Sequence, residues 1–507
     1  WSGAGSGGGS AARNPPSKVS ERLSGKPSSL LPKKSRVIVA RLRQVSFLTG
    51  GHMPEVPVKM YIDKLLKSCR DVQRPMALIS GPVKDRALRA MADRLEADAE
   101  DIFAANQFDV DAVGKTLLGE GLRGERVKEA VTRVRLMPDD VKEMAERLRL
   151  IADLPDPVGA VTRRWERPDG LQVQRVRVPL GVVGVISEMK PLITVESLAL
   201  CLKSGNICVF RPSSEWSRTH QAIETRMREE AERAGIPAGA WLLVDRPEKE
   251  VALEIMRAGK SVDAIVPRGG AGLRKTMHEQ AKMPILCYDY GISHAYVDGD
   301  VDIPSAQNVV INSKIQHAAS PNSIDTLLVQ QSMARPFLAA LIRRLLEEYK
   351  IQVIGCPKTV ALMGQMAMTG HEAVTPATEE DWHRQFQAPI LAIKMVDGMD
   401  EALAHIAGHG PCLTAVIATS DYNAAMRFSR EVDATAVMVN ASSRLNSGDG
   451  YGMGPDIGLN LSKVQTRGPI GLEQLTNEKY VAFGAGQLRH PHPVPETYED
   501  AIMLKRA

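Results

Sequence analysis

A polar elbow near the middle of the chain occupies a position where an enzyme would present a nucleophile. The stretch SKIQHAASPNSIDTLLV, residues 313–329, runs from Ser- and Ala-rich residues straight into an apolar, strand-like segment. Loops docked on the end of a strand commonly carry catalytic groups. The tip is Pro321, whose side chain has no nucleophilic atom and whose nitrogen lacks the N–H that an oxyanion would use. The position predicts catalysis, whereas the residue type does not.

Thiols are the other candidate nucleophiles. The six cysteines are Cys69, Cys201, Cys208, Cys287, Cys356 and Cys412. None forms a C-x-x-C pair, so neither a zinc site nor a disulfide framework is predicted, and a reducing compartment fits. Cys287 follows the strand-like stretch MPIL and is interpreted as a packed structural residue rather than a nucleophile. His220, His294 and His317 have no partner at metal-ligand spacing, so the sequence predicts no metal site.

The stretch PRGGAGLRK, residues 267–275, is a candidate phosphate-binding turn between a strand and a helix. Backbone N–H groups at a helix start attract anions, so Gly269 and Gly270, with Arg268 beside them, could hold a phosphate. A plain turn explains the same residues equally well.

The stretch VFRPSSEWS, residues 209–217, is similar. Ser213 and Ser214 are good N-cap residues for the following helix, and Glu215 suits its first turn. The alternative is that these residues only cap the helix. The glycine-rich GYGMGPDIG, residues 450–458, is a weak dinucleotide fingerprint because no apolar strand precedes it closely and no helix follows, so a loop is favoured.

The elements that must position these groups alternate regularly. Strand-like runs around VVGVI, ICVF, WLLV and DAIVP each lead into helix-like segments, and a second such series begins near Asp302. This alternation predicts parallel sheets with crossover helices, that is, an α/β architecture of two consecutive blocks. Two alternating runs around Pro168-Asp169-Gly170 predict a projecting β-hairpin. We expect a ligand cleft between the two blocks.

Composition narrows the class. The chain has 507 residues, of which 44% are hydrophobic and 24% charged, as in globular proteins of two or three domains. Its longest apolar run, around Val178 to Ile186, is far shorter than a membrane span. Residues 1–52 hold nine Lys or Arg and one Glu, a net +8, so the rest carries −4 of the total +4. Outside this segment, a basic face for nucleic acid is not supported.

The basic N-terminal segment is rich in Gly, Ser and Pro and has no hydrophobic period, which predicts disorder. Three interpretations are open. It is added or upstream sequence with Met53 as the natural start, which Trp1 favours, or an organelle-targeting segment, or, least favoured, a nucleic-acid-binding tail.

Several blocks together carry a resemblance to one family. They are RVRVPLGVVGVISE, ALCLKSGN, VPRGGAGL, SHAYVDGDVD, SKIQHAASPNSIDTLLV, EVDATAVMVNASSR and TRGPIGLEQLT. In collinear order over about residues 60–485, the chain resembles the γ-glutamyl phosphate reductases, also called glutamate-5-semialdehyde dehydrogenases, of the aldehyde dehydrogenase superfamily.

The resemblance implies an aldehyde dehydrogenase-like fold with a defined domain order. It divides the chain as follows: 1–57, disordered basic extension; 58–160 and 178–298, dinucleotide-binding domain; 161–177 and 478–495, oligomerisation hairpin and C-terminal strand; 299–477, catalytic-type domain. The family reduces an acyl phosphate with NADPH through a cysteine thioester, in proline biosynthesis. A thiolate suits this chemistry because it is a strong nucleophile and afterwards a good leaving group.

The chain departs from the family pattern at the reacting centre. Where the family has Gln-Arg-Pro-x-x-Cys-Asn, this sequence has QHAASPN, so Pro321 takes the nucleophile's place. Leu192 stands where the oxyanion-binding Asn is expected, Cys287 where a glutamate is expected, and Gln385 where an acidic residue grips the cofactor ribose. DIGLNL, residues 456–461, replaces Glu-Ile-Gly-Ile-Ser-Thr.

The residues that match the family's binding motifs remain. For the cofactor these are Arg211, Ser213, Ser214, Glu215, Arg268, Gly269 and Gly270. For a substrate-type pocket they are Lys190, Asn322, Asn440, Ser442 and Arg444. NADP(H) is therefore the expected cofactor, with weakened binding.

The sequence thus predicts a γ-glutamyl phosphate reductase-like protein without its catalytic groups, kept as a binding, regulatory or assembly subunit. The alternatives are an active NADPH-dependent reductase of L-glutamyl 5-phosphate and altered thiol chemistry through Cys287. A homo-oligomer is expected, with another protein partner as an option and without nucleic acid or membrane. The predicted location is the cytoplasm, or an organelle if residues 1–52 are a targeting segment.

Overall fold

The first α/β block contains a four-stranded parallel sheet. The computed structural model describes residues 56–286, 290–366, 374–464 and 466–488. In the order β5-β4-β3-β6, the strands are β3 (Val182–Ser187), β4 (Ile207–Arg211), β5 (Trp241–Leu243) and β6 (Ala264–Arg268). All three pairings are parallel, as the alternating strand and helix pattern predicts. The strands are continuous apolar runs, and β3 is buried along its whole length because helices cover the sheet.

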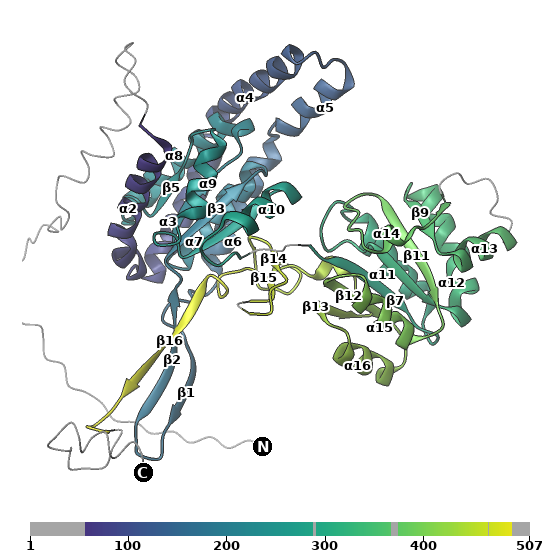
Figure 1. Ribbon diagram of the computed structural model, residues 1–507. Helices are drawn as coiled ribbons and strands as arrows, with labels where there is room; N and C mark the ends of the chain where they lie inside the picture. Colours follow the sequence, from purple (N-terminus) through teal and green to yellow (C-terminus); the bar gives the residue numbers. More distant parts are fainter. Residues whose placement is uncertain (1–55, 287–289, 367–373, 465, 489–507) are drawn as a thin grey trace, which may run out of the picture. The chain divides into compact units, whose positions relative to one another are not determined.

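Helices cover and extend this sheet (Figure 1). They are α2 (Val58–Ala77), α3 (Gly81–Ala97), α4 (Ala99–Gly119), α5 (Glu125–Val134), α6 (Pro138–Asp153), α7 (Pro191–Lys203), α8 (Ser217–Ala234), α9 (Lys249–Arg257) and α10 (Ala271–Gln280), with the 3₁₀ turn η1 (Ser214–Trp216) before α8. Helix α6 begins at Pro138 because proline suits the first helical position and Asp140 Oδ2 accepts the Met137 N–H at 2.6 Å. No helix in the described ranges is long and apolar enough to cross a membrane.

The second block contains a seven-stranded parallel sheet in the order β10-β9-β11-β8-β7-β12-β13. Its strands are β7 (Ile292–Val297), β8 (Thr326–Gln330), β9 (Gln352–Gly355), β10 (Val374–Pro376), β11 (Ile390–Val396), β12 (Cys412–Ala418) and β13 (Ala434–Val439). Its helices are α11 (Ile303–Ile315), α12 (Gln331–Arg343), α13 (Pro357–Gln365), α14 (Glu379–Trp382), α15 (Met399–Gly408) and α16 (Tyr422–Glu431), with the short turns η2 (Arg344–Glu348) and η3 (Ser443–Leu445).

One predicted boundary is wrong. Residues 178–298 were assigned to the first block, yet β7 lies in the second sheet, where it pairs with β8 and β12. Its alternate residues serve the two faces of that sheet: Ala295 and Val297 pack into one apolar cluster and Tyr296 into another. The pattern of apolar runs does not single out this strand, and the boundary at residue 298 comes from the family resemblance.

A three-stranded antiparallel sheet, in the order β1-β2-β16, forms the predicted hairpin and C-terminal strand. Strand β1 (Val161–Glu166) turns through Gly170, which has a φ of +79°, into β2 (Gln172–Pro179). Strand β16 (Thr476–Phe483) lies along β2 for all eight of its residues, from Thr476 opposite Pro179 to Phe483 opposite Gln172 (Figure 1). A strand from the far end of the sequence therefore completes this sheet.

Residues 457–475 complete the core of the first block. Ile457, Ile470 and Leu475 are almost fully buried and pack in the same cluster as β3 and α7. The turn at Gly205 holds this segment in place, because its neighbour Asn206 donates from Nδ2 to the Leu475 carbonyl at 2.7 Å. Gly205 has a φ of +75°, a region that glycine adopts without steric cost.

Candidate active site

The elbow at Pro321 is held at the amino end of the second sheet. It connects α11 to β8, and Ser320 N donates to His317 O at 3.0 Å inside it. The Pro321 carbonyl oxygen accepts hydrogen bonds from Ser293 Oγ at 3.2 Å and from Gln385 Nε2 at 3.4 Å. Proline has no N–H, so the tip offers neither a nucleophile nor a backbone donor. Gln385, expected at the cofactor ribose, is thus beside the elbow and bonded to backbone.

Asn322 ties the elbow to the segment after β13. Its Nδ2 donates to the Asn446 carbonyl at 2.8 Å, and its Oδ1 accepts from Ser320 Oγ at 2.9 Å. Ser443 Oγ donates to the Asn322 carbonyl at 2.6 Å. Asn322 is only 3% exposed, so its amide serves to fix the loop.

Arg444 and Ser442 come to the same elbow from η3. Arg444 donates from Nε to Gln316 Oε1 at 2.7 Å and from Nη1 to Ser320 Oγ at 2.6 Å. Ser442 caps η3, and Ser313 Oγ lies 3.2 Å from its hydroxyl. Burial lowers the pKa of Arg444, and within the described ranges no carboxylate forms an ion pair with it. Its positive charge is therefore supported by neutral oxygens, an arrangement that suits an anionic ligand.

Beneath the elbow lie two buried ionisable groups that the sequence pattern did not single out. Asp325 accepts the N–H of Ser293 at 3.1 Å and of Phe386 at 2.9 Å, and so joins three segments of the site. Lys314 is fully buried and donates from Nζ to the Ile324 carbonyl at 3.0 Å. Burial raises the pKa of Asp325 to about 7 and lowers that of Lys314 to about 8.

The raised pKa of Asp325 predicts a pH-dependent stability. Because the folded pKa lies above the unfolded value of about 3.9, the contribution is present at low pH and lost as pH rises through about 7. The melting temperature of the wild type, relative to that of Asp325→Asn, should fall between about pH 5 and about pH 7.5. Calorimetry on both proteins measures this difference, and a constant difference would contradict the assignment.

Cys412, the first residue of β12, is not placed as a reactive thiol. Its Sγ lies 3.7 Å from His294 Nδ1, and both side chains are buried. Burial raises the pKa of Cys412 to about 12, so the thiol stays protonated near neutral pH. Cys287, the other thiol considered for this role, lies outside the described residues.

In the first block, the candidate phosphate turn is already bonded within the chain. Gly270 N donates to Glu188 Oε2 at 3.0 Å, so a carboxylate lies at the start of α10. A side chain at Gly269 would meet the same oxygen at 2.4 Å. Arg268 Nη1 lies close to Gly458, and its charge acts on Asp456 and Glu196. The Gly270 N–H therefore has a partner within the chain, and phosphate binding at this turn stays a prediction.

In the serine-rich turn before α8, Ser213 caps the 3₁₀ turn η1, whereas the N-cap residue of α8 is Trp216. Ser213 Oγ accepts from Glu215 N at 3.3 Å, and Ser214 opens η1. Glu215 forms an ion pair with Arg133 at 2.8 Å. Arg211 donates from Nη1 and Nη2 to two backbone carbonyls, so Arg211, Ser213 and Glu215 all have partners within the chain.

The remaining pocket candidates are distributed over both blocks. Lys190 is the N-cap residue of α7 and lies 3.8 Å from Asp140, and Leu192 packs half-buried on the first core. In the second block, Asn440 adopts a φ of +52° and bonds through its amide to both backbone groups of Thr419. Asn440 therefore joins the ends of β12 and β13 instead of reaching the elbow.

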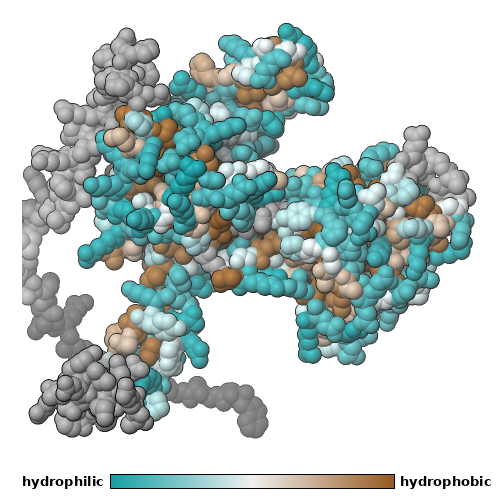
Figure 2. All heavy atoms as spheres, in the orientation of Figure 1, coloured by the Kyte–Doolittle hydropathy of each residue, from teal (hydrophilic) through white to brown (hydrophobic). Residues whose placement is uncertain are grey.

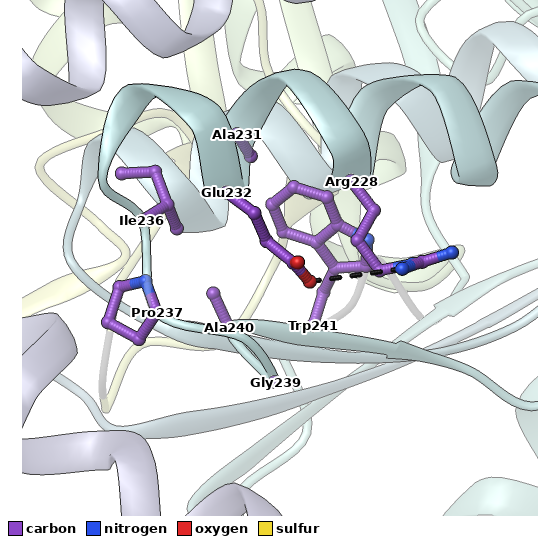
Figure 3. A pocket seen from close by; sticks show the side chains of 8 residues that line it. All are labelled: Arg228, Ala231, Glu232, Ile236, Pro237, Gly239, Ala240 and Trp241. Carbon is purple, nitrogen blue, oxygen red and sulfur yellow. Dashed lines mark ion pairs between the residues drawn. The ribbon is translucent and has the colours of Figure 1, made fainter. Parts of the chain in front are cut away.

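A small recess lies against β5 between Arg228, Glu232 and Trp241 (Figure 3). Arg228 and Glu232 form an ion pair of 3.8 Å along its rim. Its volume is about 10 Å³, whereas ligand pockets commonly measure about 300–1,000 Å³. The recess is too small for a dinucleotide.

Comparisons with known proteins identify the family and the fold. The aldehyde dehydrogenase family model matches residues 51–359 and 373–481. The γ-glutamyl phosphate reductase of Heliobacterium modesticaldum is 41% identical over 423 residues, which is 83% of this chain and 97% of that protein. The chain belongs to the γ-glutamyl phosphate reductase branch of the aldehyde dehydrogenase family.

Two further relatives of this branch extend the match. The γ-glutamyl phosphate reductase of Magnetococcus marinus is 38% identical over 84% of this chain and 98% of its own length. The crystal structure of the Thermotoga maritima γ-glutamyl phosphate reductase superposes with a TM-score of 0.78, at 32% identity over 85% of this chain and all of that one. The predicted aldehyde dehydrogenase-like fold is confirmed.

A more distant solved structure shares only the fold. The glyceraldehyde-3-phosphate dehydrogenase of Methanocaldococcus jannaschii, crystallised with NADP, has 18% identity and a TM-score of 0.58 over 86% of this chain and 97% of its own. This fold accordingly has members with bound NADP.

Proposed function

We propose that the chain functions as a γ-glutamyl phosphate reductase, using NADPH to reduce L-glutamyl 5-phosphate to glutamate-5-semialdehyde in proline biosynthesis. The end-to-end match to relatives of that name carries this proposal. That match favours the active reductase over the inactive subunit that the sequence alone suggested.

One specific observation supports a second candidate, a subunit that binds ligands without thioester chemistry. Pro321 stands where the family resemblance places the nucleophile, and it has neither a thiol nor an N–H. Leu192 provides no side-chain donor at the expected oxyanion position. Such a subunit would act in binding, regulation or assembly. Thiol chemistry through Cys287 is a third route, which the experiment below separates from the other two.

Both candidates share the same ligand classes, NADP(H) and an anionic substrate. Arg444, whose side-chain partners within the described ranges are neutral oxygens, is the group proposed to meet a negatively charged substrate group at the elbow. NADP(H) binding is proposed to be weakened, because Glu188 lies at the start of α10 and Gln385 bonds to the Gly291 carbonyl at 2.7 Å.

A paired measurement tests the proposal. NADP⁺- and phosphate-dependent oxidation of glutamate-5-semialdehyde is followed beside an NADPH titration of the same protein. Turnover above background that survives Cys287→Ser supports the reductase without a displaced thiol, and turnover lost in Cys287→Ser assigns the chemistry to that thiol. Nucleotide binding without turnover supports the binding subunit. Absence of both would refute the shared ligand class.

We propose a homo-oligomer built on the three-stranded sheet. Strands β1 and β16 are its edges, and Tyr480 and Phe483 are 68% and 56% exposed. Figure 2 shows apolar side chains among the polar ones over this sheet. Light scattering at micromolar concentration should give a dimer or larger species. A monomer would contradict the proposal.

Phe483→Asp places a charge on this surface and should weaken association. Tyr422→Asp, on α16 and 74% exposed, is the matched control and should leave the mass unchanged.

Cytoplasmic location is a further prediction, which rests on the unpaired cysteines of the described chain.

A further inference from the structure

Three potential metal ligands converge on the surface of the second block. They are Glu379 in α14, His383, the C-cap residue of α14, and His409, the C-cap residue of α15. One ligand atom from each lies within 4.8 Å of the other two. Glu379 Oε1 is 3.4 Å from His409 Nε2 and 3.9 Å from His383 Nε2.

These spacings are close to those of a metal site. Zinc binds imidazole nitrogen and carboxylate oxygen at about 2.0–2.1 Å, so two ligand atoms of a tetrahedral site are about 3.4 Å apart. One of the two measured separations already has this value. Glu379 and His383 are 79% and 51% exposed. A small rotation of either side chain would therefore shorten the 3.9 Å separation between Glu379 Oε1 and His383 Nε2 to the metal-site value.

A second observation indicates which ring nitrogen of His409 carries the hydrogen. Its Nδ1 lies 2.7 Å from the His405 carbonyl oxygen, which only accepts, so Nδ1 carries the hydrogen. In the neutral ring, Nε2 then holds the lone pair, and it is this atom that faces Glu379. A backbone acceptor behind a ligating imidazole is the usual second layer of a protein metal site.

The two supporting segments are anchored. Trp382, 7% exposed, packs with Phe386 in an apolar cluster, and its ring meets His405 edge-on at 5.5 Å. The rings of His405 and His409 lie 3.9 Å apart between centroids. The ligands therefore project from packed residues, and a site on such residues needs little reordering to bind an ion.

We propose that Glu379, His383 and His409 bind one divalent transition-metal ion, with zinc as the closest match. Two imidazoles and one carboxylate suit this class of ion, and three protein ligands leave a coordination position open. The ion would join α14 to the end of α15. Gln385, which contacts the Pro321 carbonyl, follows His383 by two residues, so the ion would also restrain one wall of the elbow.

Zinc titration calorimetry on the full-length chain, after removal of metal with a chelator, tests this proposal. We expect one Zn²⁺ bound per chain at this site and an affinity at least about tenfold weaker in Glu379→Ala, His383→Ala and His409→Ala. Glu379 and His383 are exposed, so their variants should fold even if that of His409 does not. Saturating zinc should also raise the melting temperature of the wild type but not of the variants.

Two controls separate this site from other histidines. His278→Ala removes an exposed histidine of α10, and His490→Ala/His492→Ala removes the pair in the C-terminal RHPHP. Both should keep the wild-type affinity for this ion. Unchanged affinity in all three ligand variants, or no zinc binding at all, would overturn the proposal and leave Glu379 as an ion-pair partner of the two histidines.

Discussion

If the chain is the second candidate, the binding subunit, oxidation of glutamate-5-semialdehyde by the purified chain is expected to be at least about 10³-fold slower than by the Heliobacterium modesticaldum relative assayed in parallel, whereas the proposed reductase should reach a comparable rate. The reason is the elbow tip: Pro321 has no thiol to form the thioester, and Cys412 is buried beside His294 with a pKa raised to about 12. Removing a nucleophile ordinarily costs several orders of magnitude in rate. Steady-state absorbance of NADPH measures both proteins.

Pro321→Cys is the informative variant. We expect it to raise the rate by less than about tenfold, because Leu192 still leaves the oxyanion without a side-chain donor. Wild-type turnover equal to that of the relative would show that the chain has another route and would establish the active reductase. If Pro321→Cys restored the full rate of the relative, the other differences from the family pattern, Leu192 among them, would not limit the reaction.

Asp325→Ala is expected to destabilise the protein by about 3–5 kcal/mol. The change removes the acceptor of two buried N–H groups, from Ser293 and Phe386, and leaves Lys314 buried without the carboxylate whose charge opposes the lowering of its pKa. A buried N–H that loses its acceptor lowers the stability by more than the hydrogen bond itself contributed, because the N–H stays out of contact with water. Urea unfolding, followed by circular dichroism, measures the change.

Asp397→Ala is the matched control. Asp397 is 76% exposed and forms an ion pair with Lys358 at 3.0 Å, so its loss should cost less than about 1 kcal/mol. A double variant, Asp325→Ala/Lys314→Met, should recover part of the stability because the unpaired charge is gone. An Asp325→Ala protein as stable as the control would contradict the central position assigned to this residue.

Much of the architecture follows from local pattern. Apolar runs such as VVGVI and ICVF, alternating with helical segments, predicted parallel strands β3 and β4, and Pro168-Asp169-Gly170 predicted the hairpin turn. Such patterns report burial and periodicity, which are local properties. They do not report which sheet takes a segment, and the boundary at residue 298, which comes from the family resemblance, puts β7 in the first block although it pairs in the second sheet.

The site was less accessible to sequence reasoning. Arg444 and Asn322 were identified, and they do meet the elbow or form part of it. Lys314 and Asp325 were not, because eleven residues separate them and only tertiary packing reveals that both are buried. Glu379 and His383 have the i, i+4 spacing of one helical face, a signal that could have been used, but His409 comes from a different helix.

The position of the segment 457–475 late in the sequence affects the order in which the chain folds during translation. The first core contains β3, beginning at Val182, yet it lacks Ile470 and Leu475 until nearly the whole chain has been made. At about 5–20 residues per second, the ribosome needs roughly 15–60 s to cover that distance. Residues 292–439, which hold all seven strands of the second sheet, emerge during this interval and are free to fold first. The nascent first block must therefore wait with apolar surface uncovered, and it is during this delay that chaperones would protect it.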